Sequence, residues 1–136
     1  MNIRIEKRKI KVEEYQAMRN TTGWDMLDEQ SVSHGLGNDL FSVLAFDNNE
    51  LIGIARVVGD GAIYFYVQDV IVIPEHQSKG IGKMLMSEVE AFLEEKTNNN
   101  SFIGLMAAEG VKEFYYKYGY SERPESRPGM YKMIKK

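Results

Sequence analysis

The sequence contains no cysteine and only two histidines, His34 and His76. The absence of cysteine excludes a disulfide framework, a thiolate metal site and a cysteine nucleophile. Because the histidines are far apart, a metal centre would have to consist mostly of carboxylates, and we expect no metal. Proline is scarce as well, with 3 among 136 residues, and the 43% hydrophobic and 27% charged residues are typical of a folded globular chain.

Long apolar runs and an excess of positive charge are also missing. No run approaches the roughly 18 residues that a membrane span requires, so we expect no membrane contact and a cytoplasmic location. The net charge of −3 argues against a nucleic-acid partner, because nucleic-acid binders usually show a basic face. At this length the chain is predicted to fold as a single domain, 1–136.

The spacing of apolar residues predicts a definite order of elements. Strands are expected at 3–7, 41–47, 51–60, 62–73 and 101–107, then near Tyr120 and at 129–134, and helices at 12–19, 24–32, 81–93 and 111–118. The helix after the fourth strand makes the next strand a parallel, right-handed crossover. This order predicts an α+β fold with a mixed, mostly antiparallel sheet of about six to seven strands and helices on both faces.

The stretch PEHQSKGIGK joins an expected strand to an expected helix. A Walker A loop ending at Lys83 would have Gly at position 77 and Ser or Thr at 84, where Gln77 and Met84 stand. A dinucleotide fingerprint starting at Gly80 would have a small residue where Leu85 stands. Neither of these two phosphate loops is therefore present.

The same stretch still has the parts of an anion-binding site. A strand ends, a loop with little side-chain bulk near Gly80 and Gly82 exposes N–H groups, and a helix begins with the positive end of its dipole outward. Such a site suits a pyrophosphate, and Lys79 and Lys83 add positive charge. The alternative is that the glycines only permit a tight turn and close packing. If a parallel neighbour diverges beside 70–72, that strand offers unpaired backbone groups to an extended ligand.

Two motifs carry a resemblance to a known family. The run QDVIVIPEHQSKGIGKMLM resembles the cofactor motif of the GNAT superfamily of acyl-CoA N-acyltransferases, which has Gln or Arg, two residues, Gly, one residue, then Gly or Ala. Here those positions are Gln77, Gly80 and Gly82. The run EFYYKYGY at 113–120 resembles a second landmark, a Phe-Tyr pair followed by Gly and an aromatic residue. The order of elements fits too, so the resemblance extends over essentially the whole chain.

The resemblance implies acetyl-CoA as cosubstrate. Backbone groups of Val70, Ile71 and Val72 would pair with the pantetheine arm and help to polarise the thioester carbonyl. The pyrophosphate would lie on the loop and the first helical turn, at Gln77, Ser78, Lys79, Gly80, Ile81, Gly82 and Lys83. Tyr115 would protonate the departing thiolate, whereas Tyr116 lies one residue out of register. A core position is the alternative for Tyr115, because it lies on the apolar stripe of its helix.

The general base is left open between two carboxylates. Asp69 alternates in phase with Ile71 and Ile73, so it faces a packed side of the strand near the thioester, where a raised pKa would let it act through water. Glu109 follows the next strand, at the point where the two strands would diverge. The alternative for both is a hydrogen-bonded or solvated acid without a catalytic role.

The acceptor side follows from the resemblance alone. In this fold the helices after the first strand border the acceptor, which places Trp24, Asp25 and Asp28 in that region, with Arg56 and Asp60 on the adjacent hairpin. An aromatic wall with acids suits a cationic amine. A core position for Trp24 is the slightly preferred alternative.

Together these features predict an N-acetyltransferase that moves an acetyl group from acetyl-CoA to a primary amine by direct attack in a ternary complex. The absence of cysteine favours direct transfer, because it removes the most common covalent intermediate. A small-molecule amine is the favoured acceptor. A protein or peptide N-acetyltransferase and a non-catalytic acyl-CoA-binding module are the alternatives. The sequence leaves open the acceptor, the acyl chain length and whether the chain forms a homodimer.

Overall fold

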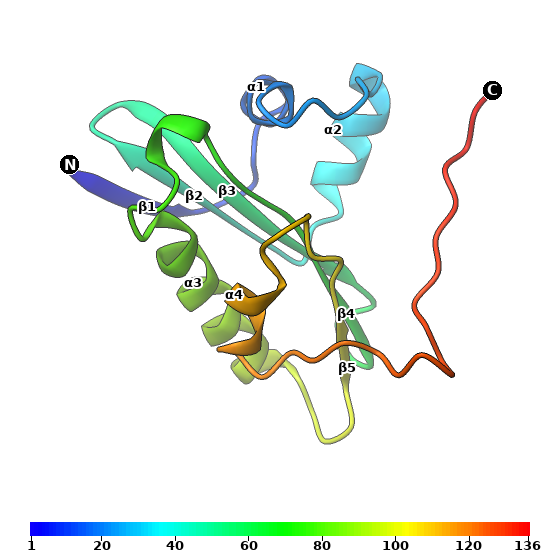
Figure 1. Cartoon of the computed structure of the whole chain (residues 1–136). Coiled ribbons are helices and arrows are strands. Elements are labelled where there is room, and N and C mark those ends of the chain that lie inside the picture. The colour runs from blue at the N-terminus through cyan, green and yellow to red at the C-terminus, as the bar shows by residue number, and fades with distance from the viewer. The chain divides into compact units, whose positions relative to one another are not determined.

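A computed structural model describes the whole chain, residues 1–136. The chain divides into two compact units, 1–106 and 107–136. The single domain expected over 1–136 stays a prediction. The first unit contains β1 (Ile3–Lys7), α1 (Val12–Asn20), α2 (Glu29–Gly37), β2 (Phe41–Asp47), β3 (Glu50–Gly59), β4 (Tyr64–Val72), the short 3-10 helix η1 (Pro74–His76), α3 (Ile81–Lys96) and β5 (Phe102–Gly104) (Figure 1). The second unit contains one helix, α4 (Lys112–Tyr116).

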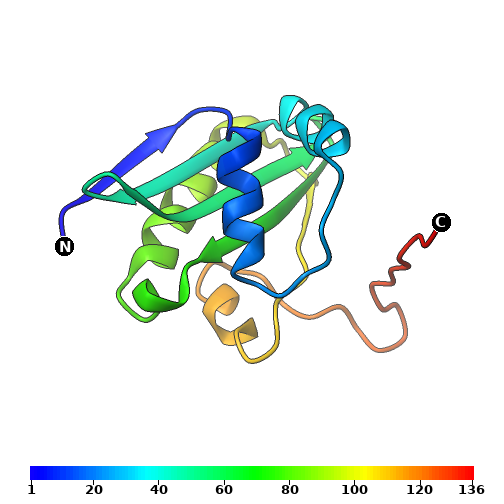
Figure 2. The same ribbon diagram turned by 90° about the horizontal axis from the view of Figure 1, so that it is seen from above.

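The first unit is built on one five-stranded sheet in the order β1-β2-β3-β4-β5. Strands β1 to β4 pair with one another in antiparallel fashion, and β5 pairs in parallel with β4 after the crossover through α3. Figures 1 and 2 show α1 and α2 over one face of the sheet and α3 over the other. The predicted α+β class, with a mostly antiparallel sheet and helices on both faces, is confirmed. No helix is long and apolar enough to cross a membrane.

The strand count is lower than predicted, because the residues around Tyr120 and at 129–134 form no strand. Gly119, with φ of 91°, turns the chain just before Tyr120. The Tyr120 N–H then donates to the carbonyl oxygen of Tyr115 (3.4 Å) and not to a neighbouring strand. The apolar residues of 129–134 likewise have no strand beside them within the second unit, and a strand needs a partner for its backbone groups.

The second helix begins at Glu29 and not at residue 24 as predicted. Asp28 is its N-cap, and Asp28 Oδ1 accepts the N–H of Ser31 (2.8 Å). This bond satisfies an N–H donor in the first turn of the helix. Val32 and Leu36 then form the buried stripe of the helix.

Helix α3 covers the second face of the sheet. Its buried residues are Ile81, Leu85, Met86, Val89 and Leu93, so the helix predicted from the apolar spacing of 81–93 is confirmed, although Met84, which belongs to that spacing, is 43% exposed. The helix approaches β3 closely at Gly53, where a Cβ would lie 3.0 Å from Leu85 Cδ1 and 3.2 Å from Ile81 Cγ2. The absence of a side chain at this position therefore sets how near the start of α3 lies to the sheet.

Strand β4 changes register with β3 at a β-bulge. Arg56 pairs with Gln68, whereas Ile54 pairs with Ile71, so two residues of β4, Asp69 and its successor, lie opposite one residue of β3. Asp69 has a left-handed backbone, with φ of 55°. A bulge of this kind bends its strand and increases the local twist.

The parallel neighbour of β4 ends before the bulge. β5 pairs only with Tyr64–Tyr66. From Val67 onward, the edge of β4 that faces away from β3 has no neighbouring strand in the sheet. The predicted divergence beside 70–72 is therefore confirmed, and it leaves backbone groups of β4 without a strand partner on that side.

Candidate active site

The loop between β4 and α3 forms the candidate anion site. Ser78 and Gly80 have left-handed backbones, with φ of 65° and 85°. Gly80 is the N-cap of α3 and provides no side-chain acceptor, and the first turn contains no acidic residue. The N–H groups of that turn, which have no intrahelical partner, therefore stay available to an anion together with the positive end of the helix dipole.

The surroundings of this loop are open. A Cβ placed on Gly80 would have no heavy atom within 4 Å. Ser78, Lys79 and Lys83 are exposed, whereas Ile81 is buried and anchors the first turn in the core. The backbone of the loop thus faces solvent on a fixed support, as the predicted pyrophosphate site requires.

Two side chains attach the loop to the sheet. Gln77 Nε2 donates to the carbonyl oxygen of Val72 (3.0 Å), and His76 Nε2 lies 3.0 Å from Asp47 Oδ2 at the end of β2. The contact with His76 and the N–H of Asn2 hold the pKa of Asp47 below its ordinary value. This role of Asp47 in fixing the loop was not predicted from the sequence. The only signal for it was His76, a histidine in the loop that had no assigned role.

The free edge of β4 continues directly into this loop. Ile71 is buried, whereas Val70 and Val72 are half-buried, so alternate side chains fix the strand against the core. The N–H of Ile73 donates to the carbonyl oxygen of Ile52 (2.9 Å), which keeps the chain attached to β3 up to the loop. The structure therefore brings the residues predicted for the pantetheine arm and for the pyrophosphate together in one continuous segment, 70–83.

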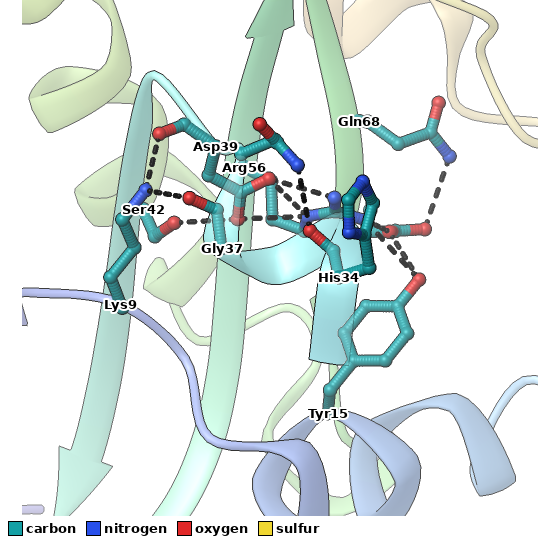
Figure 3. Close-up of polar contacts among 10 residues, drawn as sticks. Lys9, Tyr15, His34, Gly37, Asp39, Ser42, Arg56 and Gln68 are labelled. Atoms are coloured by element: carbon teal, nitrogen blue, oxygen red, sulfur yellow. Dashed lines mark hydrogen bonds and ion pairs between the residues drawn. The ribbon is translucent and has the colours of Figure 1, made fainter. Parts of the chain in front are cut away.

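Behind this edge, a network of charged side chains connects β3 and β4 to the helices on the first face (Figure 3). Arg56 Nη1 donates to Asp69 Oδ2 (2.8 Å), and Arg56 Nη2 donates to Asp39 Oδ1 (2.7 Å). The side chains of Asp39 and Asp69 are 0% and 1% exposed. The Tyr15 hydroxyl on α1 also donates to Asp69 Oδ2 (2.6 Å). We call Tyr15, Asp39, Arg56 and Asp69 the buried network.

The sequence named only two members of this network. Arg56 and Asp69 were predicted to serve separate roles, and Tyr15 and Asp39 were not predicted to have any. A signal was present, because LIGIARVV and VQDVIVI each place one charged residue inside an apolar strand. Buried charges need partners, so two such strands side by side favour an ion pair between them.

Asp69 is one of the two predicted general bases. Its Oδ1 accepts from Gln68 Nε2 (3.1 Å), and its Oδ2 accepts from Tyr15 and Arg56. The Asp69 side chain is 1% exposed, so solvent barely reaches the carboxylate. These contacts oppose a role in accepting a proton from an amine, and that role stays a prediction.

Arg56 and Asp60 were predicted to border the acceptor. The Arg56 side chain is 12% exposed and its guanidinium is occupied by the two aspartates. Burial lowers the pKa of Arg56, but the carboxylates of Asp39 and Asp69 raise it overall. This arginine therefore serves as a buried counter-ion, and nothing in its contacts supports direct binding of an acceptor.

Asp60 organises the turn between β3 and β4. Its Oδ1 accepts the N–H groups of Ala62 (2.8 Å), Ile63 (2.8 Å) and Tyr64 (3.1 Å). These bonds lower the pKa of Asp60. At about 3.3 Å per residue, the strand start at Tyr64 lies about 17 Å from Asp69. The structure thus places Asp60 at the far end of β4 from the anion site, and its role in binding the acceptor stays a prediction.

The segment between α1 and α2 keeps an aromatic side chain accessible. Trp24 is 45% exposed, so the alternative of a core position is wrong. The Arg19 guanidinium carbon lies 5.2 Å from the centre of the Trp24 ring. Arg19 Nη2 also donates to the carbonyl oxygen of Asp25 (2.7 Å). The Trp24 ring thus faces the Arg19 cation and not the acids that we expected. Acceptor binding by Trp24 and Asp25 stays a prediction.

The second unit holds the remaining two predicted catalytic residues. The Tyr115 ring makes edge contacts with the rings of Phe114 and Tyr120, at centroid distances of 5.1 and 6.3 Å. Burial and the neighbouring Tyr118 raise the pKa of Tyr115. Glu109 is exposed and lines a surface cavity of about 480 Å³. Both catalytic roles stay predictions.

The free edge of β4 and the uncapped start of α3 together form a site that suits an extended ligand with an anionic group. The sequence model of the GNAT acetyltransferase domain matches residues 10–129. The chain therefore belongs to the GNAT family of acetyltransferases.

Individual relatives agree with this assignment. The ycf52-like N-acetyltransferase of Prochlorococcus marinus is 32% identical over 116 residues, which is 82% of this chain and 63% of that protein. SA2161 from methicillin-resistant Staphylococcus aureus superposes with a TM-score of 0.90 at 26% identity, covering 97% of this chain and 99% of that chain. SP0256 of Streptococcus pneumoniae, a GNAT family acetyltransferase, gives 0.80 at 30% identity, covering 98% and 99%.

The chain is short beside its curated relatives. It spans 31% and 63% of the length of the first two that it matches. The activity, substrates and partners of those longer proteins therefore enter only as support for the proposal below.

Proposed function

We propose that this protein is an N-acetyltransferase that moves the acetyl group of acetyl-CoA to a primary amine by direct attack within a ternary complex. The observation that carries the proposal is the continuity of segment 70–83. In this segment a free strand edge runs into a helix start whose N–H groups have no cap. Coenzyme A joins an amide-containing arm to a pyrophosphate in the same order.

Each part of the segment has a task in this proposal. Backbone groups of Val70–Val72 hydrogen-bond to the amides of the pantetheine arm, as in the addition of a strand to a sheet edge. Gly80 and the first turn of α3 hold the pyrophosphate, and Lys79 and Lys83 add positive charge beside it. Gln77, which contacts Val72, holds the loop in place and leaves its backbone to the ligand.

Acetyl transfer from a thioester to an amine needs a hydrogen-bond donor that stabilises the oxyanion and an acid that protonates the leaving thiolate. When a neutral amine attacks a thioester, oriented backbone N–H groups stabilise the negative charge that develops on the carbonyl oxygen. We propose Tyr115 as the acid. With ordinary pKa values of about 8.5 for a thiol and 10 for tyrosine, full proton transfer is uphill by roughly 2 kcal/mol. The raised pKa of Tyr115 makes this step more uphill, but it also keeps the phenol protonated at neutral pH.

An alkylamine must lose a proton before it attacks, because its pKa is near 10. We propose Glu109 as the group that receives this proton, directly or through water, since its side chain is exposed. Asp69 has no such access to solvent.

The acceptor is proposed to be a small-molecule amine. The names of related proteins differ on this point: a soybean relative is a histone acetyltransferase and a rice relative is a serotonin N-acetyltransferase. The exposed Trp24 ring beside Arg19 favours an acceptor that presents a flat or apolar group. A protein N-acetyltransferase and a non-catalytic acyl-CoA-binding module are the alternatives, and a cytoplasmic location stays a prediction.

The test is thiol release from acetyl-CoA by the purified chain across polyamines, arylalkylamines, amino sugars and peptides, with affinity for acetyl-CoA measured separately by calorimetry. We expect binding without any amine and thiol release only when an amine is present. No affinity for CoA esters would overturn the proposal. Binding without release would favour the non-catalytic module, and release with peptides alone would favour the protein N-acetyltransferase.

A further inference from the structure

Asp69 combines a left-handed backbone with a buried side chain in the middle of a strand. Its φ is 55°, a conformation that L-residues other than Asn and Asp seldom adopt. Its side chain is 1% exposed. The bulge at which β4 changes register with β3 lies at this residue. The conformation of Asp69 therefore sets the direction in which Val70–Val72 continue.

Three donors from three different elements hold the Asp69 carboxylate. Tyr15 on α1 donates at 2.6 Å, Arg56 on β3 at 2.8 Å and Gln68 on β4 at 3.1 Å. Arg56 is fixed in turn by Asp39, which accepts from both Nε (3.0 Å) and Nη2 (2.7 Å). A buried side chain with this many hydrogen-bond partners is held in one rotamer. The fixed side chain in turn limits the conformation of the Asp69 backbone.

The bulge lies beyond the last residue that β5 supports. The final pair between the two strands is Tyr66 with Gly104, three positions before Asp69. From there to the loop, β4 is held only by β3 on one edge and by side chains on its faces. The buried network is therefore the support of the free edge at the point where that edge begins.

We propose that Tyr15 and Arg56 are positioning residues that act through Asp69: they hold the left-handed bulge that directs the backbone of Val70–Val72 toward the acetyl donor. This inference rests on the proposed function, because acetyl-CoA is the ligand assigned to that edge. Asp69 then contributes its backbone conformation, and its carboxylate takes no proton from the amine.

Three substitutions of one residue separate positioning from proton transfer. Asp69→Gly accepts the left-handed conformation, Asp69→Asn accepts it and keeps one side-chain oxygen that can accept from Tyr15 and Arg56, and Asp69→Ala does neither. We expect kcat per folded molecule to fall by about 100-fold in Asp69→Ala, and clearly less in the Gly and Asn variants. Equal inactivity of all three would overturn the inference, because a general base is lost equally in each.

The pH profile provides a second readout. If Asp69 were the base, Asp69→Asn would remove the acidic limb of the kcat/KM profile. If Asp69 only positions the backbone, the profile keeps its acidic limb and only the maximal value of kcat/KM changes. Loss of the limb in this variant would therefore overturn the inference.

The outer residues are tested with a matched pair. Tyr15→Phe removes a hydroxyl that donates to Asp69, and Ser42→Ala removes one that donates to Asp39 Oδ2 (2.8 Å) at the other end of the same network. Both are expected to lower the melting temperature by similar amounts. Only Tyr15→Phe is expected to lower kcat, by about ten-fold. An equal loss of kcat in both would mean a purely structural role and would overturn the assignment.

Amide NMR spectra of the whole chain separate a failure of this inference from a failure of the proposed function. The amide signals of Val70–Val72 are expected to shift most in Asp69→Ala, which loses both the left-handed conformation and the hydrogen bonds, less in Asp69→Gly and Tyr15→Phe, which lose hydrogen bonds alone, and least in Asp69→Asn. This readout needs no acceptor and no turnover. Shifts in that order support control of the bulge even if no amine is acetylated. Identical spectra for the Ala and Gly variants overturn it even if the enzyme is active.

Discussion

The Tyr15 hydroxyl donates a 2.6 Å hydrogen bond to Asp69 Oδ2 across 54 positions of the sequence. Both groups are buried, so neither has water available as a hydrogen-bond partner. Burial and the charge of Asp69 raise the pKa of Tyr15, which keeps its proton on the phenol and available for this bond. The contact therefore ties helix α1, which borders the predicted acceptor region, to the bulge from which the donor-binding edge of β4 starts.

The first prediction concerns the left-handed glycine at the start of α3. In Gly80→Ala the new residue is strained at φ of 85°, which we expect to cost about 1 kcal/mol of unfolding free energy. Relaxation of that strain turns the N–H groups of the first turn away from the bound pyrophosphate. The affinity for acetyl-CoA, measured by calorimetry, should then fall by about ten-fold, or about 1.4 kcal/mol.

Gly61→Ala is the matched control for that change. Gly61 has φ of 80°, and a Cβ there would meet only Leu40 Cδ2, at 3.6 Å. The variant should lose a similar amount of stability, because the backbone strain is of the same kind. Its affinity for acetyl-CoA should not change, because the turn lies at the other end of β4. If Gly61→Ala weakened binding as much as Gly80→Ala, the proposed position of the anion site at the start of α3 would be wrong.

The second prediction concerns the stability of the buried network. Arg56→Ala leaves two buried carboxylates without their cation, and we expect a loss of about 3–5 kcal/mol in urea unfolding. Arg8 gives a matched comparison, because it also bridges two carboxylates, those of Glu6 and Glu14, but with a side chain that is 33% exposed. Arg8→Ala should cost about 1 kcal/mol or less. Equal costs would show that burial does not distinguish the two arginines.

Much of the anion site could be predicted from the sequence because its signals are local. Glycines at 80 and 82, the apolar strand before them and the amphipathic helix after them all lie within one short segment, and backbone conformation there follows from residue type. The stripe of α3 was predictable for the same reason. The parallel crossover followed from the helix that separates β4 from β5.

The buried network could not be assembled from local signals. Tyr15, Asp39, Arg56 and Asp69 lie on four separate segments, and a periodic pattern places a residue on a face without naming its partner across the core. The bulge was also invisible, because an aspartate adopts the left-handed conformation here where glycine would have marked it. The two expected C-terminal strands did not form for a related reason, since a short apolar run becomes a strand only where a partner strand is present.

The third prediction uses pH to test the attachment of the loop. The pKa of Asp47 is lowered in the folded protein, chiefly by its contact with His76. The stabilisation that Asp47 contributes is therefore fully present above its unfolded pKa of about 3.9 and is lost as the pH falls through the folded value. The difference in unfolding free energy between wild type and Asp47→Asn should be present at about pH 5 and shrink as the pH falls toward about 2.

His76→Ala gives the background in which this prediction is checked. Without the imidazole, only the N–H of Asn2 still holds the Asp47 carboxylate. The effect of Asp47→Asn and its pH dependence should both become smaller in that background. A pH dependence of unchanged size would show that the contact between the loop and β2 contributes nothing to stability.

The fourth prediction tests the proposed acid. Tyr115→Phe keeps the ring contacts with Phe114 and Tyr120 and removes only the hydroxyl. If the phenol protonates the leaving thiolate, kcat should fall by about ten-fold or more while the affinity for acetyl-CoA stays nearly the same. Because the pKa of Tyr115 is raised, wild-type kcat should hold through mildly alkaline pH and fall only above about pH 10.

Tyr116→Phe provides the comparison within the same helix. The Tyr116 hydroxyl donates to Glu122 Oε2 (2.7 Å) at the surface, so its loss removes one exposed hydrogen bond and should leave kcat unchanged. A fall in kcat in Tyr116→Phe, with full activity in Tyr115→Phe, would identify Tyr116 as the acid. Tyr115 would then have a packing role alone. A Tyr115→Phe variant that loses stability but keeps kcat per folded molecule would lead to the same conclusion, because a proton donor acts on the rate and a core residue acts on the folded fraction.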